Sequence, residues 1–236
     1  MNWQDLVNAL FGDDHHITRT GDVITGTAQL AVGPEHQSIA VVGTTDHAAI
    51  GVDTALAQAK VVLETMQNHP GRAILLLVDT QGQRLRHRDE LLCINRYMAH
   101  LGCCVDLARR RGHRVIGLVY DQALSGGFIT SGLMADACYA LPEAEIRVMR
   151  LPAMSRVTKI SEEVLQALSQ TNPVFAPGVA NYVAMGGIQS LWSADLRQSL
   201  IAALNDTNTV DRRATLGSQR GGRALAARVA QQVEAA

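Results

Sequence analysis

The sequence has few aromatic residues, no excess charge of either sign and no long apolar run. Its 236 residues include 21 Lys and Arg against 22 Asp and Glu, so it lacks the basic excess typical of nucleic-acid-binding proteins. Aromatic residues make up only 4% of the chain. The longest apolar runs, such as residues 73–78, are far shorter than the roughly 20 residues that span a membrane. We therefore expect a soluble protein with no nucleic-acid and no membrane partner.

Cysteine is also scarce, and its spacing is not that of a metal site. Cys93, Cys103, Cys104 and Cys138 form no C-x-x-C pair and the eight histidines are scattered, which argues against structural zinc. The first residues show no cationic segment followed by an apolar stretch, so no export signal is expected. Because a chain of this length can fold on its core alone, these cysteines are predicted to be reduced thiols of a cytoplasmic protein.

Common phosphate-binding and nucleophile motifs are missing as well. No G-x-G-x-x-G follows a strand and no G-x-x-x-x-G-K-[ST] is present, which argues against dinucleotide and P-loop chemistry. Ser125 superficially resembles the serine of a nucleophile elbow, but Ala123 stands where that motif has its first glycine. No partner histidine and acid are evident, so Ser125 is interpreted as a helix N-cap rather than a nucleophile.

The N-terminal half of the sequence predicts a helix, two strands and a second helix. Residues 1–20 are expected to be a short helix followed by an exposed loop. Residues 22–30 and 38–43 read as two strands joined by a turn at Gly33-Pro34. Apolar residues at helical spacing predict a helix over residues 53–67.

The middle of the sequence predicts two parallel strands joined by a helix. The unbroken apolar runs of residues 73–78 and 115–119 are typical of strands covered on both faces. Helical spacing over residues 91–108 predicts the connection, and a crossover of this length makes the two strands parallel.

The rest of the chain predicts a glycine-rich helix, two short strands and then helices. Residues 125–135 are expected to form a buried, closely packed helix. Residues 137–141 and 145–149 read as short strands, and everything beyond residue 161 as helix or connecting loop. The predicted order is therefore ββα, βα, βα, ββ and helices.

The most informative segment is the glycine pair that opens the helix after the second buried strand. Gly126 and Gly127 lie in a first helical turn, where amide N–H groups have no intrahelical partner and the helix dipole is positive. Because glycine has no side chain, a ligand oxygen can approach these donors closely, as an enolate or thioester oxyanion would. The alternative is that both glycines only permit tight packing of helix on sheet.

A second candidate segment, Asp79-Thr-Gln-Gly82, follows the other buried strand. It is expected to form a loop at the same edge of the sheet as the glycine pair, so that two donor loops face one crevice. The alternative is that Gly82 merely turns the chain. In the basic run that follows, Arg84 and Arg86 are candidates for holding a carboxylate or phosphate, with simple surface charge as the alternative.

Four segments in this order resemble the carboxyltransferase branch of the crotonase superfamily, and within it the gamma subunits of biotin-independent malonate decarboxylases. They are Gly21-Asp-Val-Ile-Thr-Gly26, Ala40-Val-Val-Gly43, Val78-Asp-Thr-Gln-Gly82 and residues 119–128, with Ala135-Asp-Ala-Cys-Tyr-Ala-Leu-Pro142 following at the family's interval. Related carboxyltransferases usually have proline where this chain has Gln81.

The resemblance implies an α/β fold, a crotonase-like ββα spiral with additional C-terminal helices. The expected divisions are an N-terminal extension over residues 1–20, a carboxyltransferase domain over 21–192 and a helical segment over 193–236. It also implies three partners: a homologous crotonase-like beta subunit, an acyl carrier protein subunit and an acyltransferase subunit of the same complex.

The implied reaction is decarboxylation of a malonyl thioester to an acetyl thioester. The substrate is carried on the phosphopantetheine-type arm of the acyl carrier, and no cofactor or metal is expected on this chain. Gly82, Gly126 and Gly127 are then the catalytic candidates, which stabilise the enolate through backbone N–H groups. Gln81, Arg84, Arg86 and Ser125 are the substrate-binding candidates.

Several questions stay open at this point. The alternatives to a decarboxylase are a biotin-dependent carboxyltransferase subunit, a hydratase of the same superfamily and a non-catalytic partner that docks the carrier. Tyr120, His87 and His47 are weak candidates for the proton donor. A basic C-terminal segment that includes Arg220 and Arg223 is either a docking patch for an acidic carrier or a solvated helical tail.

Overall fold

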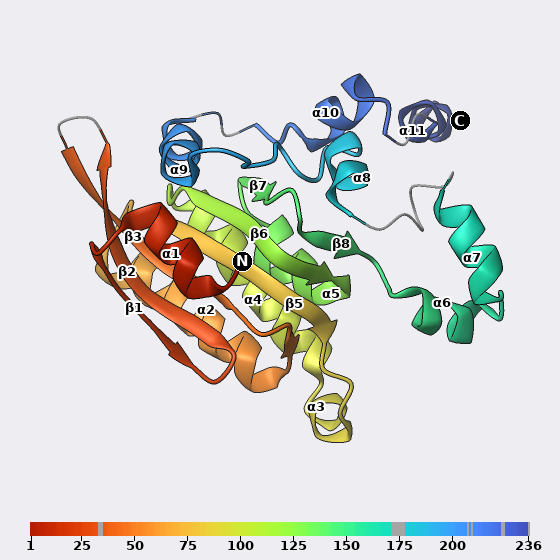
Figure 1. The fold of residues 1–236 in the computed structure, drawn as a ribbon, viewed down its shortest axis with the longest axis horizontal. Coiled ribbons are helices and arrows are strands. Elements are labelled where there is room, and N and C mark those ends of the chain that lie inside the picture. The colour runs from red at the N-terminus through yellow and green to blue at the C-terminus, as the bar shows by residue number, and fades with distance from the viewer. Residues whose placement is uncertain (33–34, 171–177, 207, 209, 223–224, 236) are drawn as a thin grey trace.

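A computed structural model describes residues 1–236 except 33–34, 171–177, 207, 209, 223–224 and 236. The fold is built on one mixed sheet, in which the main strands follow the order β1-β2-β3-β5-β6-β7 (Figure 1). Two short strands lie off this path, since β4 pairs with β5 and β8 pairs with β6. The sheet is the frame on which the candidate residues are placed.

The N-terminal part contains one more strand than the sequence predicts. After helix α1 (Trp3–Phe11), residues His15–Thr20 form strand β1, so the expected exposed loop is wrong. Its sequence is polar because β1 is an edge strand on which Ile17 is the buried residue; its full length pairs with β2 (Val23–Val32). Strand β2 pairs antiparallel with β3 (Glu35–Thr44), which confirms the two predicted strands; Gly33 and Pro34 lie outside the described residues.

The central strands are parallel, as predicted, but longer than their apolar runs. Strand β5 (Ala73–Gln83) pairs in parallel with β3 and with β6 (Val115–Leu124). The expected loop over residues 79–82 is wrong, because the short strand β4 (Ala48–Ile50) pairs with this segment and extends β5 through it.

Two of the three helices that connect these strands were predicted from the periodicity. Helix α2 (Val52–Asn68) matches the expected range closely, and α4 (Ile94–Arg110) accounts for most of the second. The start of that second helix is separate: α3 (His87–Leu91) ends before Cys93, whose φ of 59° interrupts the helical path.

The glycine-rich helix is closely packed, as the sequence predicts. It begins as α5 (Ser125–Phe128) and continues as a π-helical turn, η1 (Ile129–Leu133), before strands β7 (Ala137–Ala140) and β8 (Glu145–Arg147). A methyl group on Gly132 would lie 2.7 Å from the Cγ2 of Val78, so η1 lies directly on strand β5.

The described part of the remaining chain forms helices, as predicted beyond residue 161, and it also contains α6, which lies before that residue. These helices are α6 (Leu151–Thr158), α7 (Glu162–Ser169), α8 (Val179–Ala184), α9 (Leu196–Asn205), α10 (Arg213–Gln219) and α11 (Ala226–Glu234). Arg220, a candidate for carrier docking, donates to the backbone carbonyls of Val183, Ile188 and Gln189 and so ties α10 to α8. Arg223 lies outside the described residues.

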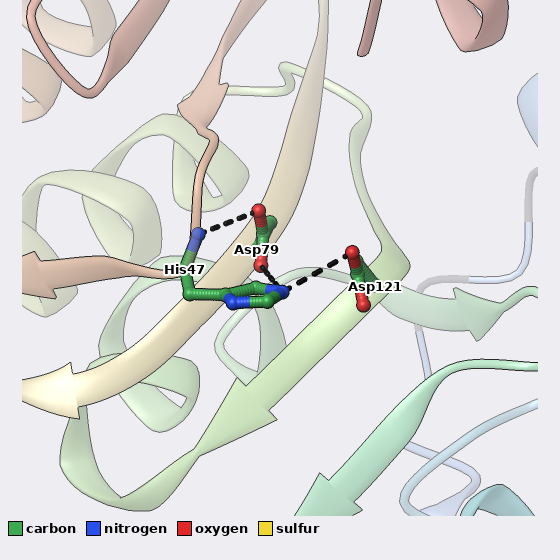
Figure 2. Close-up of side chains that lie close together, drawn as sticks. All are labelled: His47, Asp79 and Asp121. Atoms are coloured by element: carbon green, nitrogen blue, oxygen red, sulfur yellow. Dashed lines mark hydrogen bonds and ion pairs between the residues drawn. The ribbon is translucent and has the colours of Figure 1, made fainter. Parts of the chain in front are cut away.

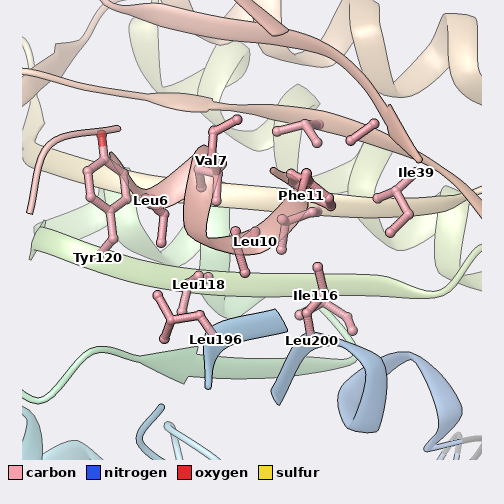
Figure 3. Close-up of a cluster of buried hydrophobic side chains, with 14 of the residues drawn as sticks. Leu6, Val7, Leu10, Phe11, Ile39, Ile116, Leu118, Tyr120, Leu196 and Leu200 are labelled. Carbon is pink, nitrogen blue, oxygen red and sulfur yellow. The ribbon is translucent and has the colours of Figure 1, made fainter. Parts of the chain in front are cut away.

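Alternate residues of the central strands support two hydrophobic layers, one on each face of the sheet. On one face Leu75, Leu77 and Ile116 pack with helices α1 and α9; Figure 3 shows Ile116 in this cluster. On the other face Ile74 and Leu76 pack with α2 and α4. Residues 1–20 and 193–236 therefore both contribute to the core around the sheet. The proposed domain boundaries at residues 20 and 192 stay predictions.

The four cysteines differ in their burial. Cys103 is exposed and its neighbour Cys104 is buried, and all four cysteines are free. Burial raises the pKa of the Cys138 thiol to about 12, so it stays protonated near neutral pH. No helix in the described ranges combines the length and apolar character needed to cross a bilayer.

Candidate active site

The two candidate segments meet where the end of β5 touches the first turn of α5. A methyl group built on Gly127 would lie 3.0 Å from the Cα of Gly82 and 3.0 Å from the Oγ1 of Thr80. Gly82 has a φ of 100°, and its N–H donates to the Thr80 hydroxyl at 3.0 Å. Because both positions carry no side chain, the backbones of β5 and α5 approach each other directly. Gly127 therefore has the packing role that the sequence offered as the alternative to an oxyanion role.

Ser125 does not cap the helix, which corrects the sequence interpretation. The N-cap position is Leu124, and Ser125 is the first helical residue with a left-handed φ of 54°. Its hydroxyl donates to the carbonyl of Val148 at 2.6 Å. Ser125 thus ties the first turn of α5 to the segment that follows β8.

Two hollows open on either side of Ser125. The first, here named the Arg150 hollow, has a volume of about 290 Å³ and is lined by Gln81, Gln83, Leu85, Leu124, Ser125, Met149, Arg150 and Ala153. The second, here named the Phe128 hollow, has a volume of about 260 Å³ and is lined by Ser125, Gly126, Phe128, Ile129, Leu133, Arg147, Val148, Met149 and Tyr182. The structure therefore brings Gln81, Ser125 and Gly126 to the surface of these hollows, with Gly82 and Gly127 packed together beneath Ser125.

Sequence reasoning missed the residues that the β8–α6 segment contributes to these hollows. Arg147, Met149 and Arg150 carry no periodic or motif signal, and they reach the site because β8 pairs with the end of β6. Only the short strand at residues 145–149 was predicted, and it gave no indication of which site it would border.

Arg84 and Arg86 lie elsewhere, at the start of helix α2, and line neither hollow. Arg86 donates to Asp89 at 2.6 Å, and Asp89 in turn accepts the amide N–H of Val52 at 3.1 Å. Arg84 lies 3.7 Å from the carboxylate of Asp22. The Arg86 guanidinium holds the pKa of the buried Asp89 carboxyl below its ordinary value. This carboxylate caps α2, whose N-cap residue Gly51 has no side chain.

We expect Arg86→Gln to lower the free energy of unfolding by about 1–2 kcal/mol near neutral pH, because it leaves a buried carboxylate with one partner fewer. Asp89 has a lowered folded-state pKa, so its contribution is present above its unfolded pKa and is lost as pH falls through the folded value. Urea unfolding of wild type and variant should therefore differ at about pH 7 and converge below about pH 4.

The matched control is Arg88→Gln, which removes the same charge from an exposed pair with Asp53 and should leave the free energy of unfolding close to that of wild type. If Arg86 instead binds substrate, Arg86→Gln will raise KM without a loss of stability. We expect KM to stay within about twofold of wild type, because Arg86 lines neither hollow. A twofold change in KM corresponds to less than about 1 kcal/mol of binding free energy.

A third hollow, of about 460 Å³, contains a cluster of three titratable side chains (Figure 2). The Nε2 atom of His47 lies 3.3 Å from Asp121 and 3.9 Å from Asp79, and ligand-type atoms of the three residues lie within 4.8 Å of one another. Burial raises the pKa of Asp79, although the backbone N–H groups of His47 and Gln122 donate to it and partly offset the effect. Histidine and carboxylate groups at this spacing are a donor set that a divalent cation can use.

None of the three proton-donor candidates lines either hollow beside Ser125. His47 belongs to the separate cluster, and His87 is exposed at the start of α3. Tyr120 is buried, donates to the carbonyl of Thr44 at 2.8 Å and has its pKa raised by burial. None of these three candidates therefore places an acid beside Gly126 or Ser125.

Comparison with known proteins assigns the family. The family model described as malonate decarboxylase gamma subunit matches residues 45–236. The chain belongs to the malonate decarboxylase gamma subunit family. It is also 31% identical over 202 residues to the malonyl-S-ACP:biotin-protein carboxyltransferase MADD of Malonomonas rubra, covering 76% of this chain and 69% of that protein. The family resemblance inferred from the sequence is confirmed.

Solved structures agree with this family assignment. A Pseudomonas malonate decarboxylase hetero-tetramer in complex with coenzyme A contains a chain with a TM-score of 0.80 and 25% identity, covering 97% of each chain. A Pseudomonas malonate decarboxylase hetero-dimer gives a TM-score of 0.74 at 25% identity, with 96% and 97% coverage. The transcarboxylase 12S matches in fold, with a TM-score of 0.71 over 86% of this chain and 41% of that one. The predicted crotonase-like α/β fold is confirmed.

Proposed function

We propose that this chain is the gamma subunit of a malonate decarboxylase and helps convert a malonyl thioester to an acetyl thioester and carbon dioxide. The observation that carries the proposal is the direct contact of Gly82 with Gly127, which sets the end of β5 against the first turn of α5. In the first turn of α5, where amide N–H groups have no intrahelical acceptor, Ser125 lines both hollows and Gly126 lines the Phe128 hollow.

The chemistry requires a fixed acceptor for the charge that develops. When the bond to the departing carboxylate breaks, its electron pair moves into the thioester and places negative charge on the thioester oxygen. Backbone N–H groups of Gly126 and Gly127 are the proposed donors to that oxygen, and Gly82 holds them in place. Removal of one such donor typically costs about 3 kcal/mol of transition-state stabilisation. The enolate carbon then takes a proton from solvent or from a group of the partner subunit.

The substrate is proposed to arrive on the phosphopantetheine-type arm of an acyl carrier subunit. The Phe128 hollow, with Phe128, Ile129 and Leu133 in its lining, suits the apolar stretches of such an arm. Gln81 and Ser125 border the Arg150 hollow, where the acyl group would lie. A homologous beta subunit would complete the site, and an acyltransferase subunit would load the carrier.

The purified complex of this chain with its beta subunit should release carbon dioxide and acetyl thioester in equal amounts from malonyl carrier protein, with no biotin present. Isotope-labelled malonyl thioester and trapping of the gas give both yields. Substrate that stays intact in this assay contradicts the proposal.

A carboxyltransferase is the second candidate, favoured by the name of the Malonomonas relative. In that case the labelled carboxyl group would be transferred to an added biotinyl protein, and release of carbon dioxide would depend on that acceptor.

A further inference from the structure

Arg150 differs from the other arginines near the site in having no acidic partner. Arg147 lies 2.8 Å from Glu145, and Arg86 is bonded to Asp89. Arg150 pairs with no carboxylate in the described part of the chain, and its Nη2 donates instead to the neutral side chain of Gln122 at 3.0 Å. Its charge is therefore not neutralised by any carboxylate among the described residues.

Hydrogen bonds hold both the guanidinium and the backbone of Arg150 in position. Gln122 is a buried residue of β6, 7% exposed, and its backbone N–H donates to Asp79 at 3.3 Å. Arg150 itself immediately precedes helix α6, and its carbonyl accepts the N–H of Met154. Backbone and side chain are thus both anchored, although four of the five guanidinium N–H donors have no partner in the described chain.

The hollow that Arg150 borders is suited to an anion. Its lining contains no aspartate or glutamate, and the side chains of Gln81 and Ser125 give it neutral polar groups. A planar guanidinium binds a carboxylate through two parallel N–H donors. The shared lining residue Ser125 places this hollow next to the first turn of α5.

We propose that Arg150 binds the free carboxylate of the malonyl group and so distinguishes malonyl from acetyl thioester, an inference that rests on the proposed function. The malonyl carboxylate is separated from the thioester carbonyl by a single methylene group. If the carbonyl oxygen lies at the amides of Gly126 and Gly127, the carboxylate must lie in an adjoining hollow. The phosphodiester of the carrier arm lies at the other end of the arm, so it does not fit the same place.

One experiment distinguishes binding of the malonyl carboxylate by Arg150 from binding of the arm's phosphodiester. The complex with the beta subunit is prepared with Arg150→Gln, with Arg150→Lys and, as a matched control, with Arg156→Gln, which removes an exposed charge from α6. For each we measure kcat and KM for malonyl carrier protein, and direct binding of malonyl and acetyl carrier proteins.

We expect Arg150→Gln to weaken malonyl carrier binding and raise its KM roughly 10- to 100-fold, the value of a hydrogen-bonded charge pair, while acetyl carrier binding changes less than about twofold. The effect on kcat should be smaller, because the carboxylate charge leaves Arg150 as the reaction proceeds. Arg150→Lys should be intermediate and Arg156→Gln close to wild type.

Equal weakening of both carriers would assign Arg150 to the arm's phosphodiester, and unchanged malonyl binding would remove it from recognition; either overturns the inference. Measuring complex assembly and melting temperature for each variant identifies a folding defect. If Arg150→Gln fails to fold, Arg150→Lys provides the binding comparison instead. If the wild-type complex releases no carbon dioxide, the proposed function fails, whereas the binding comparison still decides the role of Arg150.

Discussion

Replacing Gly127 with alanine should lower the free energy of unfolding by about 1–3 kcal/mol and reduce turnover per folded molecule at least tenfold. The added methyl group meets the backbone of Gly82 and the hydroxyl of Thr80 at 3.0 Å. Neither neighbour is free to move: Gly82 is paired with β4, and the Thr80 hydroxyl donates to the carbonyl of Ala48 at 2.7 Å. The helix must therefore shift away from the strand, and its first-turn amides move with it.

This expectation combines two roles that the sequence presented as alternatives. From the sequence, an oxyanion role for Gly127 predicts that alanine costs turnover while leaving most of the melting temperature intact. The contact with Gly82 adds a packing cost that the usual preference of helices for alanine, about 1 kcal/mol, offsets only in part. Denaturant unfolding of the chain and kcat of the complex, corrected for the folded fraction, measure the two effects separately.

Gly102→Ala is the matched control for this experiment. Gly102 is also a buried helical glycine, but a methyl group there would make only ordinary contacts, at 3.8 Å to Thr130 and 3.9 Å to Met134. It should leave turnover unchanged and stability equal or higher by up to about 1 kcal/mol. A Gly127→Ala chain as stable as wild type would show that strand β5 shifts to accommodate the methyl group. A variant fully active once folded would leave Gly126 or Gly82 as the residue to test.

The isolated chain should decarboxylate malonyl thioester at no more than about one hundredth of the rate of the complex, a loss comparable to that of an oxyanion-hole donor. Leu85, Ile129 and Val148, which line the two hollows, are 83%, 51% and 54% exposed. Hollows this open keep the substrate carboxylate hydrated, and hydration stabilises it against loss of carbon dioxide. None of the three proton-donor candidates, His47, His87 and Tyr120, lines these hollows.

Carbon dioxide release by the monodisperse chain, by the beta subunit alone and by their mixture measures this dependence. Addition of the beta subunit should restore the rate in proportion to complex formed, up to one equivalent. Full turnover by the isolated chain would place the whole site on this subunit and exclude the need for a partner.

The parts of the fold that the sequence predicted are those with strong periodicity or unbroken apolar runs. Helix α2 and the cores of β5 and β6 belong to this group, because burial on one or both faces determines their residue types. Strand β1 was missed because an edge strand with one buried residue needs few apolar side chains. The extension of β5 to Gln83 depends on pairing with three residues of β4, too few to give a pattern.

The residues of the candidate site could likewise be predicted only where the local sequence carries a signal. The glycines were identified because their lack of a side chain is itself a signal, and the resemblance to a known family added Gln81. Arg86 lies near the site in sequence, but its partner Asp89 turns it to the start of α2. Arg150 is far from Gln122 in sequence and meets it only because β8 pairs with β6. Such contacts depend on the tertiary fold, which local sequence patterns do not contain.

The sharing of one hydrophobic cluster by α1 and α9 has a consequence for synthesis on the ribosome. Leu6, Leu10 and Phe11 are fully buried in a cluster that also contains Leu196 and Leu200, and Arg197 donates to the carbonyl of Leu10 at 3.1 Å (Figure 3). The first helix packs partly on the sheet, but Leu196 and Leu200 of α9 are translated only after the whole sheet. Until then the part of this cluster that α9 covers is open to water, so the nascent chain offers a binding site for chaperones and a route to aggregation.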